Sequence, residues 1–325
     1  MLWFFVLLIA GLAFLVLAGD FLVRGAVGAA LKLGVSRILA SVLIVGFGTS
    51  APEMLVATDA ALSGAPGLAM GNIVGSNIAN VLLVLGAPAL FFALSTRGQG
   101  LLRSTVFTAL ATIAWLVLTP VLGLTPLIGV IFIAALILYI VGSLLMPPGG
   151  DPNALVSDEV DDEPPGWVKT ALFIALGVVG LPLGSHLAIT GALGLSELWG
   201  WQSELVGLTL LAIGTSLPEF AAAMAAAFRK DEDMVFGNVV GSNMFNILGA
   251  GGIVALFGPF TLPPIFERFD HWFMAGAFLV VFVTVLMRRR LGWFTGIILL
   301  LAYAAYLFGL HHFYILGEGW SALWS

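Results

Sequence analysis

Residues 46–86 and 212–252 carry the same polar, glycine and proline positions, and these residue types suit the binding of a cation. The first stretch reads GFGTSAPEMLVATDAALSGAPGLAMGNIVGSNIANVLLVLG and the second reads AIGTSLPEFAAAMAAAFRKDEDMVFGNVVGSNMFNILGAGG. Matched positions are always 166 residues apart, as for Glu53 and Glu219 (219 − 53 = 166), so the repeat contains no insertion or deletion. Because the shared positions combine carboxylates, hydroxyls and amides, we interpret them as an ion site encoded twice.

Glu53 and Glu219 are the acidic residues of this motif, and both lie deep within apolar segments. Each lies about 15 residues into its segment, which is roughly 22 Å along a helix rising 1.5 Å per residue. A carboxylate at such depth in a membrane is costly and by default marks a path for ions or protons. The pair carries a formal charge of −2. That charge matches one divalent cation or two or more monovalent cations.

Each glutamate directly follows a proline in the motif GTSxPE. Pro52 and Pro218 lack a backbone donor and clash with the carbonyl four residues earlier, so both helices should break near Gly48 and Gly214. Within hydrocarbon, broken backbone is tolerated only against protein or a watery cavity. Freed carbonyls and neighbouring hydroxyls are hard oxygen ligands that suit sodium and calcium. A simple proline kink is the alternative, and two copies each followed by glutamate disfavour it.

The motif GNxVGSNxxN supplies neutral oxygen donors in both copies. It places polar residues four apart on one helix face: Asn72, Ser76 and Asn80 in the first copy, and Asn238, Ser242 and Asn246 in the second. We favour ligation over helix–helix hydrogen bonding at four positions: Ser76, Asn80, Ser242 and Asn246. We favour it less at Asn72, Asn77, Asn238 and Asn243. The glycines of this motif indicate close helix packing.

The composition assigns the class of protein. The chain has 325 residues, of which 60% are hydrophobic and 9% charged, with no cysteine, and its mean hydropathy is +1.11. These values predict an all-α integral membrane protein, long enough for about ten spans of roughly 20 residues. The absence of cysteine excludes disulfides and thiolate metal sites. The apolar N-terminus lacks a basic region, so we interpret it as the first span and not a signal peptide.

Apolar runs bounded by Gly, Pro or charge predict ten transmembrane helices. They cover roughly 2–31, 38–61, 69–94, 104–122, 126–146, 167–193, 204–228, 236–258, 271–287 and 292–315. A proline-flanked acidic stretch at 147–166 is predicted to be a solvated linker. It separates a first five-helix repeat at 1–146 from a second at 167–325.

Basic residues give the orientation of these spans. With the N-terminus outside, eleven of the twelve Lys and Arg residues fall on the cytoplasmic side, which is a strong positive-inside bias. Only Arg268 falls outside. The prediction is therefore a cell (inner) membrane protein with both termini outside and the linker in the cytoplasm. Five spans per half is an odd number, so the second repeat is inverted, as in many secondary transporters.

The paired motifs resemble a known family. GTSAPE with GNIVGSNIAN, and GTSLPE with GNVVGSNMFN, resemble the two α-repeats of the cation/calcium antiporter superfamily, specifically its prokaryotic sodium/calcium exchanger branch. The resemblance implies a central cluster of sites occupied alternately by sodium and calcium. It also implies that the first and sixth spans slide across the rest of the protein to alternate access.

The resemblance further implies roles for particular residues. Glu53 and Glu219 would bridge the calcium site and neighbouring sodium sites. The other implied ligands are Thr49 and Thr215, through backbone and hydroxyl oxygens, then Ser50, Ser76, Ser216 and Ser242 at flanking sodium sites, and Asn80 and Asn246 at the centre. Many relatives have aspartate where this chain has Asn246. Here both central positions are amides, which argues against potassium co-transport.

The sequence therefore predicts an antiporter, not an enzyme, that exchanges sodium for calcium by alternating access. Calcium/proton antiport is the nearest alternative, and an ion channel is a less favoured one. We expect no cofactor, no nucleic-acid partner and no obligate protein partner; the ions are substrates and the lipid bilayer is the surroundings. Away from the motif, Asp20 and Arg24 should form a local pair. Asp59 is interpreted as a solvated interfacial charge, with attraction of cations as the alternative.

Overall fold

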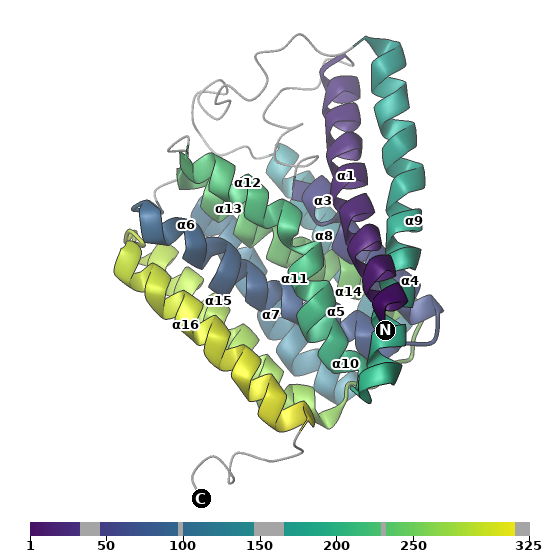
Figure 1. The fold of residues 1–325 in the computed structure, drawn as a ribbon. Helices are drawn as coiled ribbons and strands as arrows, with labels where there is room; N and C mark the ends of the chain where they lie inside the picture. The colour runs from purple at the N-terminus through teal and green to yellow at the C-terminus, as the bar shows by residue number, and fades with distance from the viewer. Residues whose placement is uncertain (33–45, 97–99, 146–165, 229–231, 316–325) are drawn as a thin grey trace, which may run out of the picture.

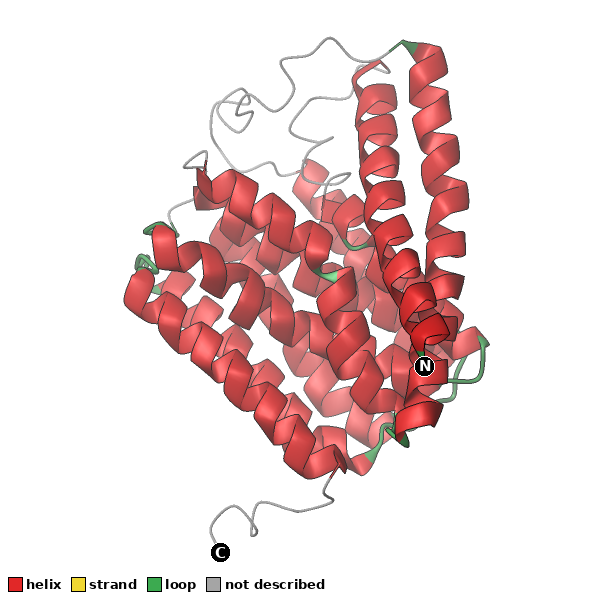
Figure 2. Cartoon of the chain, in the orientation of Figure 1, coloured by secondary structure: helices red, strands yellow, loops and turns green. Residues whose placement is uncertain are grey.

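A computed structural model describes the chain except for residues 33–45, 97–99, 146–165, 229–231 and 316–325. Almost all of the described chain is helical (Figure 2). The elements of the first half are α1 (Leu2–Lys32), α3 (Gly46–Thr49), α4 (Ala51–Leu62), α5 (Pro66–Ala79), η2 (Asn80–Leu85), α6 (Gly86–Phe91), α7 (Leu101–Leu122) and α8 (Pro126–Leu145). The label η marks π-helical turns.

The second half has more elements than the described part of the first half. It contains α9 (Trp167–Trp199), α10 (Ser203–Val206), η3 (Gly207–Leu211), α11 (Ala212–Thr215), α12 (Leu217–Phe228), α13 (Glu232–Met244), η4 (Phe245–Ala250), α14 (Gly251–Leu256), η5 (Phe266–Asp270), α15 (His271–Leu286), α16 (Trp293–Leu310) and η6 (His311–Ile315).

Within the described residues, eight helices are long and apolar enough to cross a membrane. A ninth candidate is the broken pair Ser203–Thr215 and Leu217–Phe228, which is bent by 41°. The expected span at 38–61 begins in a part of the chain that is not described, as does most of the predicted linker at 147–166. The all-α membrane class is thus confirmed, and ten spans in two inverted repeats stay a prediction.

Two spans form the centre of the molecule. In the candidate spans Pro66–Phe91 and Met234–Leu256, 83% of the residues in the most apolar window are buried, whereas none of the other six long helices exceeds 50%. These two spans carry the GNxVGSNxxN motif. Apolar side chains on most of the other spans remain exposed, as expected for surfaces that contact lipid. The polar motif therefore lies where protein, and not lipid, surrounds it.

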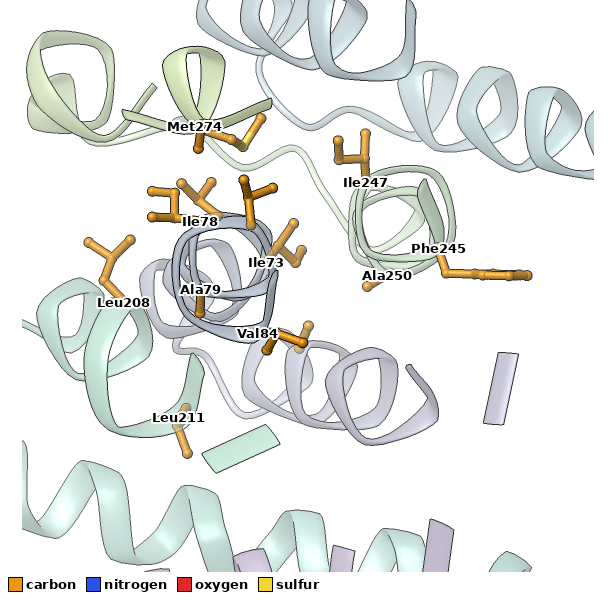
Figure 3. Packing of buried hydrophobic residues seen from close by; sticks show 14 of the residues in the cluster. Ile73, Ile78, Ala79, Val84, Leu208, Leu211, Phe245, Ile247, Ala250 and Met274 are labelled. Atoms are coloured by element: carbon orange, nitrogen blue, oxygen red, sulfur yellow. The ribbon is translucent and has the colours of Figure 1, made fainter. Parts of the chain in front are cut away.

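The central helix α5 is packed on several sides. Figure 3 shows Ile78 of α5 on the side that faces Met274 of α15, Ile73 on the side that faces η4 with Ile247, and Leu208 of η3 on the side opposite η4. Gly71 allows a close approach of α10, because a Cβ there would meet the carbonyl oxygen of Glu204 at 2.5 Å. The interpretation of the motif glycines as positions of close helix packing is therefore supported for Gly71.

Helices α1 and α9 form a pair along one edge of the molecule (Figure 1). Small residues bring their backbones together. A Cβ at Gly177 would meet the backbone of Leu22 at 2.8 Å, and a Cβ at Gly184 would meet that of Leu15 at 2.9 Å. This small-residue seam makes the two long helices one packing unit.

The predicted helix breaks are confirmed in both halves. Helix α3 ends at Thr49, Ser50 has φ −87° and ψ 0°, and α4 begins at the next residue. In the second half α11 ends before Ser216, which has φ −79° and ψ 3°. Each proline lies at the second position of the following helix, where its missing donor is tolerated. The breaks leave Ser50 and Ser216 between two helical segments.

Two features of the spans differ from the expected plain helices. A π-helical turn starts at Asn80 in the first half, and another, starting at Phe245, contains Asn246. Such turns often occur at functional sites. The two central amides of the motif, Asn80 and Asn246, therefore lie in π-helical turns and not in regular α-helix.

The span predicted at 271–287 begins earlier than expected. It starts with η5, and Asp270 at the end of that turn is fully buried. Its carboxylate accepts hydrogen bonds from Tyr306 at 2.9 Å and Tyr314 at 2.7 Å. This cluster connects α15 to the last helix. The predicted pair of Asp20 and Arg24 is confirmed, at 2.9 Å on an exposed surface.

Candidate cation site

All ten residues predicted as cation ligands are buried. They are Thr49, Ser50, Glu53, Ser76, Asn80, Thr215, Ser216, Glu219, Ser242 and Asn246. They come from the two helix breaks and the two central spans. Burial of this many polar side chains within a membrane protein is costly unless each finds a partner. The hydrogen bonds of these residues therefore decide what the site can bind.

Glu219 lies between hydroxyls from both halves of the chain. Its Oε1 accepts a hydrogen bond from Ser50 at 3.3 Å and another from Ser242 at 3.3 Å. Ser50 comes from the first break, and Ser242 from α13 of the same half as Glu219. The second oxygen, Oε2, is buried and has no hydrogen-bond partner among the described residues.

Glu53 is even less satisfied by protein groups. Neither of its carboxylate oxygens has a hydrogen-bond partner among the described residues, although both are buried. Its polar neighbours are Thr215, Ser216 and Glu219 of the second half. Ser216 Oγ is likewise buried and unpartnered in the described chain. In such surroundings the negative charge of Glu53 has to be neutralised, either by a bound cation or by protonation.

The two glutamates have equivalent surroundings across the halves. Glu53 faces the Thr-Ser pair of the second break, and Glu219 faces Thr49 and Ser50 of the first. The two carboxylates are also close enough to interact electrostatically. The duplicated motifs are thus brought together as one cluster in which hydroxyls of each half lie beside the other half's carboxylate.

The central amides add neutral oxygens to this cluster. Asn80 and Asn246 are fully buried, and none of their side-chain N and O atoms has a hydrogen-bond partner within the described ranges. Ser76 Oγ lies 3.4 Å from Thr215 Oγ1. Buried amides without partners are rare in folded proteins. The oxygens of these two amides are therefore available to a bound cation.

Two residues that we favoured less as ligands hold the glutamate backbones in place. Asn72 donates to the carbonyl of Glu53 at 3.3 Å, and Asn238 donates to that of Glu219 at 3.1 Å. Asn72 also accepts a hydrogen bond from Thr215 at 3.2 Å. In each half the asparagine lies 19 residues after the glutamate whose carbonyl it binds. This equal separation could have indicated the pairing from the sequence, whereas spacing on one helix face could not.

The other pair of asparagines acts between and within helices. Asn243 donates to the carbonyl of Asn77 at 3.3 Å, and Asn77 donates to Ile73 in its own helix at 2.7 Å. The amide nitrogen of Asn243 therefore bonds between helices, while the Oδ1 atoms of Asn77 and Asn243 are buried and have no partner among the described residues.

The cluster is an oxygen-only site with two carboxylates. In the described part of the chain no three His, Cys, Asp or Glu side chains gather as a transition-metal site would require. Carboxylate, hydroxyl and amide oxygens are the ligands of hard cations such as calcium and sodium. The geometry points to cation binding at the meeting point of two broken helices, a place where transporters bind their ions.

Comparison with known proteins agrees with this chemistry. A family model described as sodium/calcium exchanger protein matches residues 3–145 and 169–310. The chain belongs to the sodium/calcium exchanger family. The two matched stretches begin 166 residues apart (169 − 3 = 166), which is the offset of the repeated motif.

Relatives within the exchanger family match over nearly the whole chain. The putative antiporter CaxA of Alkalimonas amylolytica is 32% identical over 308 residues, covering 93% of this chain and 96% of that protein. The sodium/calcium exchanger MaX1 of Methanosarcina acetivorans is 27% identical over 342 residues, covering 93% and 97%. A structure of the sodium-calcium exchanger NCX_Mj, soaked with Na⁺ and Sr²⁺, has a TM-score of 0.65 at 27% identity and covers 93% and 97%. The chain is therefore a membrane protein of the cation/calcium antiporter type.

Proposed function

We propose that this antiporter exchanges sodium for calcium and that the ions bind at Glu53 and Glu219. The observation that carries the proposal is the pair of buried carboxylates with three unpartnered oxygens in the described chain, Glu53 Oε1 and Oε2 and Glu219 Oε2. Such oxygens require compensation by positive charge. The relatives MaX1 and NCX_Mj, both named as sodium/calcium exchangers, support sodium and calcium as the two substrates.

Exchange follows from competition for one set of oxygens. One calcium ion neutralises the charge of −2, and it would take its oxygens from the carboxylates, hydroxyls and amides of the cluster. Two or more sodium ions would occupy overlapping positions, so the two substrates exclude each other. A cluster holding three sodium ions would carry a net positive charge whereas the calcium-loaded cluster would be neutral, and exchange would then be electrogenic.

The proposed setting is the cell (inner) membrane with both termini outside. Support comes from the distribution of Lys and Arg, since eleven of the twelve fall on one side of the predicted spans. In this setting the two five-helix repeats, 1–146 and 167–325, are inverted relative to each other. The sodium gradient would then drive calcium outward. No enzymatic step is proposed, because the matching relatives are named as antiporters and exchangers.

Calcium/proton antiport is the second candidate, and one observation favours it. Glu53 has no hydrogen-bond donor for either oxygen among the described residues, and a proton would neutralise it as well as sodium would. A channel is disfavoured because broken helices that meet at a buried site suit alternating access. The ion that competes with calcium therefore separates the two antiporter candidates.

Sodium is expected to weaken calcium binding to the purified protein in detergent. Calcium stabilises the folded state in proportion to its binding, so the apparent melting temperature rises with calcium. We expect the calcium concentration for half of this rise to increase about tenfold or more in 100 mM sodium, compared with 100 mM potassium. The measurement is thermal unfolding at fixed pH and ionic strength.

A second series at fixed sodium, with pH varied, tests the proton as competitor. If acidification shifts the calcium dependence and sodium does not, calcium/proton antiport replaces the proposal. If neither ion shifts it, the site does not exchange these ions at all.

A further inference from the structure

Two tyrosines hold the last long helix of each half to the helix before it. In the second half, Tyr306 of α16 donates a hydrogen bond to the buried carboxylate of Asp270 at 2.9 Å. In the first half, the hydroxyl of Tyr139 on α8 lies 2.7 Å from that of Ser104 on α7, and both residues are half-buried. We call these contacts the Tyr306 clamp and the Tyr139 clamp.

The two clamps occupy equivalent positions along the sequence. Asp270 lies 166 residues after Ser104 (270 − 104 = 166), which is the offset of the duplicated motif. Tyr306 lies 167 residues after Tyr139 (306 − 139 = 167), so the second half has one extra residue between its two clamp partners. The repeat therefore extends beyond the motif into the last two long helices of each half.

Both clamped helices pack against a central span. Helix α16 contacts η2 and α6, and α8 contacts η4 and α14. A Cβ at Gly296 of α16 would lie 2.9 Å from the carbonyl oxygen of Gly86. A Cβ at Gly129 of α8 would lie 2.7 Å from that of Gly252. These contacts are also equivalent, since the offsets are again 167 for the clamped helices (296 − 129 = 167) and 166 for the central spans (252 − 86 = 166).

The contacts of the clamped helices lie at the π-helical turns of the two central amides. Turn η2 starts at Asn80, and Gly86 directly follows its last residue. Turn η4 contains Asn246, and Gly252 lies just beyond its end. The support is crossed between the halves, because α16 of the second half contacts the turn of Asn80 and α8 of the first half contacts that of Asn246.

Packing has to fix the direction of these amides, because no side-chain hydrogen bond does. None of the side-chain N and O atoms of Asn80 and Asn246 has a hydrogen-bond partner within the described ranges. A π-helical turn is rare and departs from the regular hydrogen-bond pattern of a helix. Its shape, and the direction of an amide on it, therefore depend on the helix packed against it.

We propose that Tyr306 and Tyr139 are positioning residues of the cation site, which hold α16 and α8 against the turns that carry Asn80 and Asn246. The inference rests on the proposed function, in which both amides supply oxygens to the bound ion. A clamp fixes its helix, the helix fixes the turn, and the turn fixes the amide oxygen.

The two clamps differ in strength. Asp270 offers a carboxylate, which also accepts a hydrogen bond from Tyr314 at 2.7 Å, whereas the Ser104 clamp joins two neutral hydroxyls. Hydrogen bonds to charged groups contribute more than those between neutral groups. Loss of the Tyr306 clamp should therefore have the larger effect on calcium binding.

Removal of single hydroxyls tests the clamps with little change in shape. The variants are Tyr306→Phe and Tyr139→Phe, and the matched control is Tyr303→Phe on α16. The hydroxyl of Tyr303 is buried and has no hydrogen-bond partner in the described part of the chain. The first measurement is the apparent Kd of the purified protein for calcium, from calcium-45 binding at one temperature. A clamp with a purely structural role would lower the melting temperature and leave this Kd unchanged.

Tyr306→Phe is expected to raise the Kd for calcium about threefold or more, and Tyr139→Phe about twofold or more. Tyr303→Phe should leave it unchanged. In an Asn80→Ala background, Tyr306→Phe should add little while Tyr139→Phe keeps its full effect, because residues that act through one another are not additive. In an Asn246→Ala background the two clamp variants should exchange these behaviours.

Hydrogen–deuterium exchange gives a second readout that needs no calcium. Tyr306→Phe should speed exchange in residues 80–85, and Tyr139→Phe should speed it in residues 245–250. Tyr303→Phe should speed neither. If Tyr306→Phe fails to fold because Asp270 loses a donor, Tyr139→Phe carries the test alone, since its clamp is neutral.

The two readouts separate the clamps from the proposed function. If the wild-type protein does not bind calcium but the crossed pattern of deuterium exchange appears, the proposed function is wrong and the clamps still hold the turns. If calcium binds and both clamp variants keep the Kd of Tyr303→Phe, the positioning role is wrong. It is also wrong if Tyr306→Phe loses its effect in the Asn246→Ala background and keeps it in the Asn80→Ala background.

Discussion

Glu53→Gln and Glu219→Gln are each expected to abolish calcium exchange without unfolding the protein. Each substitution removes one of two charges that face calcium in a buried site, where charge interactions are only weakly screened. We expect at least about a 100-fold loss of flux, equivalent to ~2.7 kcal/mol. The measurement is calcium flux at matched protein content, with Glu197→Gln, an exposed glutamate on α9, as the control.

The stability of these variants should change in the opposite direction to their activity. Without cations, Glu53 is a buried carboxylate with no hydrogen-bond donor in the described chain. Replacing it with a neutral isostere removes an uncompensated charge, so the apo protein should unfold at an equal or higher temperature. Calcium should no longer raise that temperature. A large drop in apo stability would mean that Glu53 has a structural role, and flux near wild type would remove it from the site.

Asn246→Asp is expected to change which ions accompany calcium. Asn246 is fully buried and unpartnered in the described residues, and the substitution adds a third negative charge to a cluster of −2. That charge requires a further proton or monovalent cation. We expect calcium flux at neutral pH to fall about tenfold or more and to become dependent on pH or on an added monovalent cation. Flux as a function of pH, in sodium and in potassium, measures this.

Two further variants separate charge from shape at this position. Asn246→Ser keeps the charge at −2, so it should change apparent affinity without creating the new dependence on pH or potassium. Asn80→Asp places the charge at the equivalent position in the first half and should behave as Asn246→Asp does. If Asn246→Asp retains the wild-type ion dependence, Asn246 does not face the bound ions.

The helix breaks and the burial of the motif could be predicted because their causes are local. Proline acts on the carbonyl four residues earlier, so Pro52 and Pro218 specify breaks wherever the helices lie. The exact 166-residue repeat then indicated that both glutamates belong to one cluster. Their shared neighbourhood in the structure supports this, and their role as cation ligands stays a proposal.

Other features could not be predicted because they depend on contacts between distant segments. Nothing in the spacing shows that Ser50 bonds Glu219 of the other half, or that Ser185 meets Asp59. The π-helical turn at Asn80 has no distinct residue preference to reveal it. Asp270 was missed because charged neighbours lower local hydropathy, which moved the predicted start of its span beyond it.

Sodium/calcium exchange at the two glutamates is tested by calcium-45 uptake into proteoliposomes loaded with sodium, with potassium or with acid. Sodium/calcium exchange at Glu53 and Glu219 predicts uptake only when an outward sodium gradient is present, and its loss in Glu53→Gln and Glu219→Gln. Reversal of the flux with membrane potential would further show that more than two sodium ions accompany each calcium ion. Uptake driven equally well by acid-loaded vesicles would contradict sodium coupling, and uptake that persists in both glutamate variants would contradict the proposed site.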